Sequence, residues 1–259
     1  MPQFQVRPGT ADRGICHMVV HHNEYRLPPC LGEGDLVVDI GAHVGSFAYA
    51  ALLRGSRRVW AVEADAENFR IAGQNLAPYL VRGEATLLHG AVWRSDANDD
   101  LLRWSGYPRF GEDFPRLQGM VNTGGGSVIW AGEGTVVPKL AFDDLMAQIT
   151  DGGERRVRLV KLDCEGSEWP ILLTSRTLGW IDEICGEFHE IGSPHPGIDC
   201  GRTPLESLFC LPEAPPLTAE TLVRCLGAAG FEVTFERHRR PNGEAEAQGL
   251  FFARRKQDD

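Results

Sequence analysis

Short apolar runs alternate with helical patterns along most of this 259-residue chain, and that alternation limits the folds open to it. Runs of five or six apolar residues are typical of buried strands, and apolar positions recurring every three or four residues are typical of helices. The strand-like runs are 36–40, 58–62, 85–89, 157–162 and 183–188, and the helical patterns are 45–53, 66–76, 142–149 and 166–175. Because strands separated by helices form parallel sheets covered on both faces, the pattern predicts an α/β domain.

The C-terminal part of the chain departs from this alternation. A helical pattern at 218–229 precedes two β-like runs, 231–235 and 250–253, with an Asn242-Gly243 pair between them. Asn-Gly between β-like runs is typical of a hairpin turn. We therefore predict an antiparallel pair added at the edge of a mostly parallel, doubly wound sheet.

Two long segments, 93–135 and 192–217, interrupt the pattern within what we interpret as one domain over residues 1–259. The first is rich in aromatic residues, and the second holds six of the chain's 16 prolines. Long loops in compact domains are usually functional. We expect both segments to act as lids over a substrate, with a small hydrophobic cluster that binds nothing as the alternative.

Composition excludes several classes of protein. The formal net charge of −10 argues against a large nucleic-acid footprint, which needs a basic face. No apolar run approaches the roughly 18 residues of a membrane span, and residues 1–10 lack a secretory leader pattern. The seven cysteines show no CxxC spacing, so we expect reduced thiols and a cytoplasmic protein rather than a zinc or disulfide framework.

A glycine-containing turn follows the first strand-like run. The sequence from Asp39 to Gly45 reads DIGAHVG, so its glycines have the spacing G-x-x-x-G. The dinucleotide spacing G-x-G-x-x-G is missing, which disfavours a pyrophosphate ligand. A helix N-terminus at this turn could instead hold a carboxylate, and Asp39 suits an amine.

An acid at the tip of the second strand-like run, Glu63, is placed where nucleotide folds bind ribose hydroxyls. A carboxylate site, an amine site and a ribose site together match S-adenosylmethionine. A purely structural strand–helix loop is the alternative for the glycine turn alone.

Charged residues gather after two later strands. Lys161, Asp163 and Glu165 alternate at the end of one, and Glu187 and His189 close the next. Strand ends of a parallel sheet meet at one edge, so we expect these groups to face one crevice. The alternatives are a Lys–Glu pair that caps a helix and a hydrogen-bonded structural histidine.

Three segments, VVDIGAHVGSFA, VWAVEAD and LVKLDCEGSEWPIL, resemble the FkbM-type methyltransferases over about residues 30–190. The resemblance implies a seven-stranded Rossmann-like sheet and use of S-adenosylmethionine. One departure is Ala64, where the family typically has proline. The implied cofactor contacts are Asp39, Gly41, His43 and Gly45 at the methionine end, Glu63 with Ala64 at the ribose, Gly90 and Ala91 at the adenine, and Asp163 near the sulfonium.

The resemblance also implies the acceptor class, a hydroxyl on a small natural product or sugar. Candidate catalytic residues are Lys161, Asp163, Glu187 and His189. We favour His189 as the base because the ordinary pKa of histidine lies near neutrality. Asp163 and Glu187 could instead hold Mg²⁺, which would acidify the hydroxyl.

Three other functions stay open at this point. The first is 2′-O-methylation of RNA by a lysine–acid set, which the net charge opposes. The second is a nucleotide-dependent oxidoreductase, which the missing dinucleotide pattern opposes. The third is a cofactor-binding subunit without activity.

Overall fold

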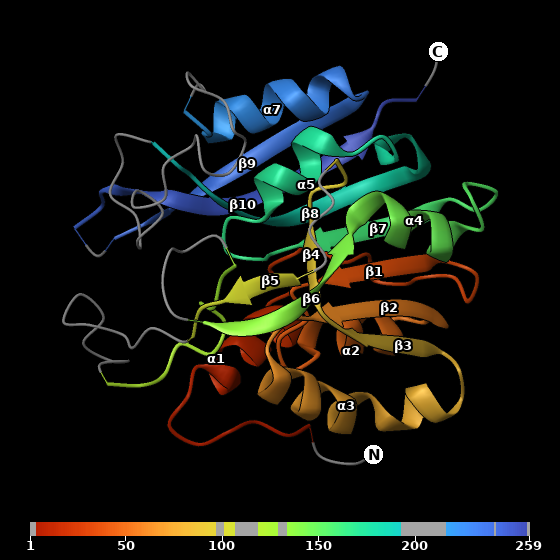
Figure 1. Ribbon diagram of the computed structural model, residues 1–259, viewed down its shortest axis with the longest axis vertical. Coiled ribbons are helices and arrows are strands. Elements are labelled where there is room, and N and C mark those ends of the chain that lie inside the picture. The colour runs from red at the N-terminus through yellow and green to blue at the C-terminus, as the bar shows by residue number, and fades with distance from the viewer. Residues whose placement is uncertain are drawn as a thin grey trace.

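The computed structural model describes residues 4–96, 101–106, 119–128, 134–192, 216–240 and 242–257. Its main sheet has seven strands in the order β3-β2-β1-β7-β8-β10-β9 (Figure 1). The first five strands in this order are parallel, and β10 runs antiparallel to both β8 and β9. These strands are β1 (Leu36–Ile40), β2 (Arg58–Glu63), β3 (Ala85–His89), β7 (Val157–Leu162), β8 (Ile181–His189), β9 (Phe231–Arg239) and β10 (Ala245–Arg255). The predicted α/β fold with an antiparallel terminal pair is confirmed.

Helices cover both faces of this sheet. The hydrophobic cores show which helix belongs to which face, since each core joins one side of the strands to its own helices. One face packs against α2 (Ser46–Leu53), α3 (Ala66–Val81) and the π-helix η1 (His17–His21), which follows α1 (Asp12–Cys16). The other packs against α4 (Phe142–Thr150), α5 (Glu168–Thr174) and α7 (Ala219–Ala228), and a 3-10 turn η2 (Leu178–Trp180) precedes β8.

The sequence of β1 shows why both faces are covered. All five of its residues are buried, and they alternate between the two cores. Val38 packs in the core of α4 and α5, whereas Val37 packs in the core of α2. A strand buried on both sides needs apolar residues at every position, and the exception in β1 is Asp39. A buried carboxylate needs a partner, and that of Asp39 pairs with Lys161 of the neighbouring strand β7.

A second sheet of three strands, β4-β6-β5, was not predicted. It consists of β4 (Ala91–Trp93), β5 (Leu101–Trp104) and β6 (Thr135–Ala141). These strands lie within or beside the segment 93–135, so part of that predicted lid is regular structure (Figure 1). Nearly all of the other predicted lid, 192–217, lies outside the described residues.

Two further properties of the described residues bear on the sequence-based expectations. No helix among them combines the length and the hydropathy that a membrane-crossing segment requires. Their cysteines carry free thiols; these are Cys16, Cys30, Cys164, Cys185 and Cys225.

Candidate active site

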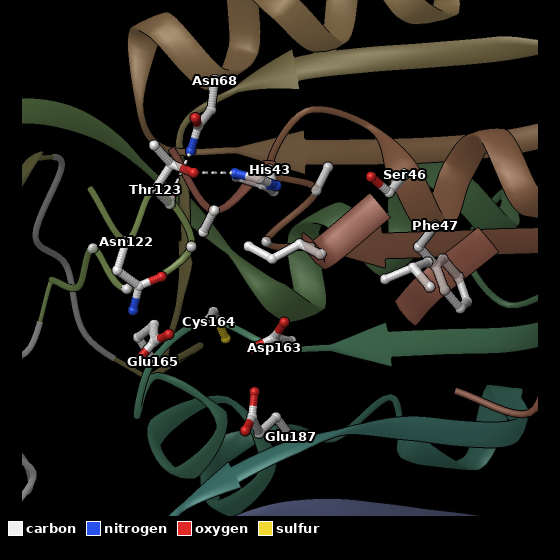
Figure 2. Close-up of a pocket in the computed structure, with 18 of the residues that line it drawn as sticks. His43, Ser46, Phe47, Asn68, Asn122, Thr123, Asp163, Cys164, Glu165 and Glu187 are labelled. Atoms are coloured by element: carbon white, nitrogen blue, oxygen red, sulfur yellow. Dashed lines mark hydrogen bonds between the residues drawn. The ribbon is translucent and has the colours of Figure 1, made fainter. Parts of the chain in front are cut away.

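A cavity of about 1080 Å³ opens at the carboxyl ends of the parallel strands. Its wall combines the ends of β1, β2, β7 and β8 with residues from the segments 10–25 and 119–128 (Figure 2). Most residues of two predicted groups line it: the cofactor contacts and the charged residues that follow the later strands. From the first come Gly41, His43, Glu63, Ala64, Gly90 and Ala91, and from the second Lys161, Asp163, Glu165, Glu187 and His189.

The glycine turn is shaped by a close approach of two loops. Gly41 has a φ of +76°, and a Cβ built on it would lie 1.8 Å from the carbonyl oxygen of Asp163. Any side chain here would therefore push apart the loops that follow β1 and β7. Glycine is needed at this position both for its backbone conformation and for the absence of a Cβ.

Glu63 is held in place by backbone amides at the end of β2. Its Oε2 accepts a hydrogen bond from the His43 amide at 2.7 Å, and its Oε1 accepts one from the Asp65 amide at 2.9 Å. Burial raises the pKa of Glu63 to about 7, although these amides act to lower it. Oε1 also accepts from the Asn68 side chain, whereas Oε2 keeps a second lone pair, so the fixed carboxylate can still accept a hydroxyl donor from the cavity.

A buried polar network joins the loop 119–128 to this turn, and sequence analysis missed it. Thr123 Oγ1 lies 2.9 Å from His43 Nε2 and donates to Asp12 Oδ1 at 2.6 Å, while the Asn68 amide donates to the Thr123 carbonyl (Figure 2). Arg7 pairs with Asp12 at 2.8 Å. The network fastens the loop and α1 over the wall of the cavity, and it leaves His43 Nδ1 without a hydrogen-bond partner.

Asp39 and Gly45, which are predicted at the methionine end of a cofactor, are not among the residues that line the cavity. Asp39 is 0% exposed. It pairs across the β1–β7 register with Lys161, whose Nζ lies 3.3 Å from Asp39 Oδ1. Its other oxygen accepts from the Ala48 amide at the start of α2. Gly45 instead begins α2 in a left-handed conformation, packed against α3.

Lys161 is bound rather than available as a base. Its Nζ donates to the Gly41 carbonyl at 2.6 Å and lies 3.6 Å from Asp163 Oδ2. Burial alone would lower its pKa, but Asp39 and Asp163 outweigh burial and raise it. The ammonium therefore joins β7 to the glycine turn, which makes Lys161 a positioning residue.

The acid cluster contacts Tyr25 and His238, which sequence analysis did not assign to it. Asp163 Oδ2 accepts from the Tyr25 hydroxyl at 2.9 Å, and Glu187 Oε1 lies 3.2 Å from His238 Nδ1. His189 Nε2 lies 3.4 Å from Glu165 Oε2. Asp163, Glu187 and His189 each offer one potential metal-ligand atom, and these atoms lie within 4.8 Å of one another.

The surroundings of His189 act on the property for which it was favoured as a base, a pKa near neutrality. Burial would lower the pKa of His189, but the neighbouring carboxylates of Glu165, Glu168 and Glu187 raise it well above its ordinary value. These carboxylates favour the imidazolium form over the neutral form that a base needs. The sequence showed the histidine but not how many acids surround it.

Tyr25 and Glu24 are further cavity residues that sequence analysis missed. They follow η1, in an N-terminal segment that shows no strong hydrophobic period. The only local signal is a run of charged and histidine residues from 12 to 24, which by itself does not indicate a site.

A family model described as the Methyltransferase FkbM domain matches residues 39–195. Among solved structures, the chain is similar to a methyltransferase FkbM from Methylobacillus flagellatus KT, at 14% identity and a TM-score of 0.46, covering 91% of this chain and 47% of that one. It is also similar to a precorrin-6y C5,15-methyltransferase from Geobacter metallireducens GS-15, at 12% identity and a TM-score of 0.41, covering 98% and 93%. Comparison with curated proteins gave no match. The matched segment begins at Asp39 and ends after His189, so it contains both the predicted cofactor contacts and the charged residues that follow the later strands.

Proposed function

This chain belongs to the FkbM methyltransferase family, and we propose that it methylates a hydroxyl group on a small, polyhydroxylated molecule. Membership of the family implies that the methyl donor is S-adenosylmethionine. The observation that carries the proposal is that the glycine turn, Glu63 and the acid cluster line one cavity. Donor and acceptor can therefore meet in that cavity.

The cavity fits the donor in size and chemistry. Pockets for small molecules measure roughly 300–1,000 Å³. At about 1080 Å³ this one has space for S-adenosylmethionine and an acceptor beside it. In our proposal Glu63 binds the ribose hydroxyls, Gly41 and His43 face the methionine end, Ala64, Gly90 and Ala91 lie along the nucleoside, and Asp163 lies near the sulfonium. The partnerless Nδ1 of His43 is a polar atom that the donor can satisfy.

Methyl transfer to oxygen requires alignment and the loss of a proton. S-adenosylmethionine supplies an electrophilic methyl group, and the protein must hold the acceptor oxygen in line with it while excluding water. Asp163 and Glu187 both face the cavity from neighbouring strand ends, where either can accept a hydrogen bond from an acceptor hydroxyl (Figure 2). They can favour proton loss as bases, or by holding a cation that acidifies the hydroxyl.

The loop 119–128 supports a small acceptor rather than a polymer. Its residues 120 and 122–126 line the cavity, and Thr123 fastens it to the glycine turn. We propose that this loop covers the acceptor. Synthesis of a natural product in the cytoplasm is the setting we propose, and the net charge of −10 opposes RNA as the acceptor.

A labelling experiment tests the proposed reaction. The protein is incubated with methyl-labelled S-adenosylmethionine and, in separate reactions, with a panel of sugars and other polyols, a small-molecule extract of its source, and short RNAs. We expect labelled product from the small molecules, with mass spectrometry placing the methyl on oxygen. Label on nitrogen, on a carboxylate or only on RNA would contradict the proposed acceptor.

The pKa of Glu63 predicts how cofactor affinity depends on pH. Ribose hydroxyls donate to the carboxylate form, so binding must first remove the proton that Glu63 holds below a pKa of about 7. Affinity for S-adenosylhomocysteine should therefore rise with pH, by about tenfold from pH 6 to pH 8. Calorimetry across this range measures it. Glu63→Gln should weaken binding and flatten the profile, and an equally steep profile in that variant would assign the proton elsewhere.

A further inference from the structure

We propose that Asp163, Glu187 and His189 form a binding site for a first-row divalent transition-metal ion such as Mn²⁺, Fe²⁺ or Zn²⁺. Their potential ligand atoms lie within 4.8 Å of one another. The sheet brings them together, because Leu162 pairs with Gly186 in the parallel β7–β8 register and the next residue on each strand is an acid. His189 lies two residues beyond Glu187 in β8, on the same side of the strand.

The two carboxylates keep free oxygen atoms for an ion. Asp163 Oδ2 accepts from Tyr25, and Glu187 Oε1 lies against His238. Among the described residues, these contacts leave Oδ1 of Asp163 and Oε2 of Glu187 without a protein partner. In Figure 2 the side chains of Asp163 and Glu187 extend from neighbouring strands into the same part of the cavity. Each carboxylate is thus held by a protein contact at one oxygen, and its other oxygen is free to bind an ion.

His189 provides an independent observation. Its side chain is almost completely buried, with the residue 2% exposed, yet its Nδ1 has no hydrogen-bond partner and lies 3.5 Å from Glu168 Oε1. A buried ring nitrogen that lacks a hydrogen bond is unusual in proteins. An imidazole beside two carboxylates is instead the donor set of a metal site.

The charges around the three residues favour an added cation. Glu24 and Glu165 line the same cavity, and Glu165 lies 3.4 Å from His189 Nε2. Lys161 is one of the nearby cations, and its ammonium is turned toward the Gly41 carbonyl and Asp39. Among the described residues that line the cavity, aspartate and glutamate outnumber lysine and arginine; the acids are Glu24, Glu63, Asp163, Glu165, Glu187 and Glu246, and the bases are Arg13, Lys161 and Arg239.

The imidazole decides the class of ion. Mg²⁺ and Ca²⁺ prefer all-oxygen sites, whereas a nitrogen donor with two carboxylates suits Mn²⁺, Fe²⁺ or Zn²⁺. This inference replaces the Mg²⁺ expected from the two acids alone. The role of the ion, though not its binding, rests on the proposed function, since an acceptor oxygen bound to it would lose its proton more readily.

Titration of the intact protein with Mn²⁺, followed by the electron paramagnetic resonance signal of free Mn²⁺, tests the site without any methyl acceptor. We expect one saturable site. Asp163→Asn, Glu187→Gln and His189→Gln should each weaken Mn²⁺ binding by about tenfold or more. Glu24→Gln is the matched control, because it removes a surrounding carboxylate but none of the three ligands, and its loss of affinity should be much smaller than theirs.

Three results would overturn the proposal. The first is the lack of saturable Mn²⁺ binding by the wild-type protein. The second is unchanged affinity in His189→Gln. The third is an equal loss in Glu24→Gln, which would indicate general attraction to an acidic cavity. Melting curves identify any variant that fails to fold, and the remaining variants then decide. Binding of S-adenosylhomocysteine, measured separately, distinguishes failure of the metal site from failure of the proposed function.

Discussion

Asp163→Asn is expected to lower methyl transfer by about 10²–10⁴-fold, measured with the acceptor that labelling identifies. The replacement has nearly the same shape, and its amide can keep the contact with Tyr25. What it removes is the negative charge between Lys161 and the cavity. That charge is needed whether Asp163 acts on the acceptor hydroxyl directly or as a metal ligand.

Asp144→Asn is the control for this variant. Asp144 is an exposed aspartate of α4. It should keep the wild-type rate, and both variants should keep the wild-type melting temperature within a few degrees. A wild-type rate in Asp163→Asn would show that the reacting atoms lie elsewhere in the cavity.

Gly41→Ala is expected to lower the free energy of unfolding by more than about 3 kcal/mol and to abolish cofactor binding. A left-handed conformation costs an alanine about 1–2 kcal/mol by itself. The larger cost comes from overlap, because the new Cβ would lie 1.8 Å from the Asp163 carbonyl oxygen and force the two loops apart. Denaturant titration measures the change in stability.

Gly152→Ala separates these two costs. Gly152 has a φ of +73°, close to that of Gly41, but no atom lies within 4 Å of its Cβ position. It should lose only the conformational term, about 1–2 kcal/mol. Equal losses in the two variants would contradict the close approach of the loops after β1 and β7.

The main sheet could be predicted from the sequence because its signals are local. The buried run Leu36–Ile40 and the apolar α2 that follows it have patterns that few other structures share. The strands β4, β5 and β6 could not be predicted in this way. In β6 the exposed Val136 and Pro138 flank a single buried residue, Val137, and pairing with β5 depends on contacts across a long loop.

Among the site residues, too, those with a local sequence signal could be predicted and those that depend on distant contacts could not. Glu63 and Asp163 were placed correctly in the cavity wall because each directly follows or ends a strand. Asp39 lies outside the cavity wall because its side chain points to Lys161, and a sequence does not show toward which side a strand side chain points. Thr123 and Asp12 were missed because their contact joins residues 111 positions apart.

The pKa of His189 shows a further limit of the sequence. Its ordinary pKa predicts a base near neutrality, but three carboxylates around a buried ring raise that value. Two of them, Glu165 and Glu168, come from the turn after β7 and the start of α5. Only the folded turn brings them to the histidine.

Calorimetric titration of S-adenosylhomocysteine into the wild-type protein, Glu63→Ala and Glu67→Ala tests the central claim most directly. The claim is that the donor binds in this cavity with its ribose on Glu63. We expect one site per chain in the wild type and a loss of about 1–3 kcal/mol of binding free energy in Glu63→Ala. Glu67, an exposed residue of α3 four positions away, should give wild-type affinity when replaced. Wild-type affinity in Glu63→Ala, or no binding by the wild type, would contradict the account.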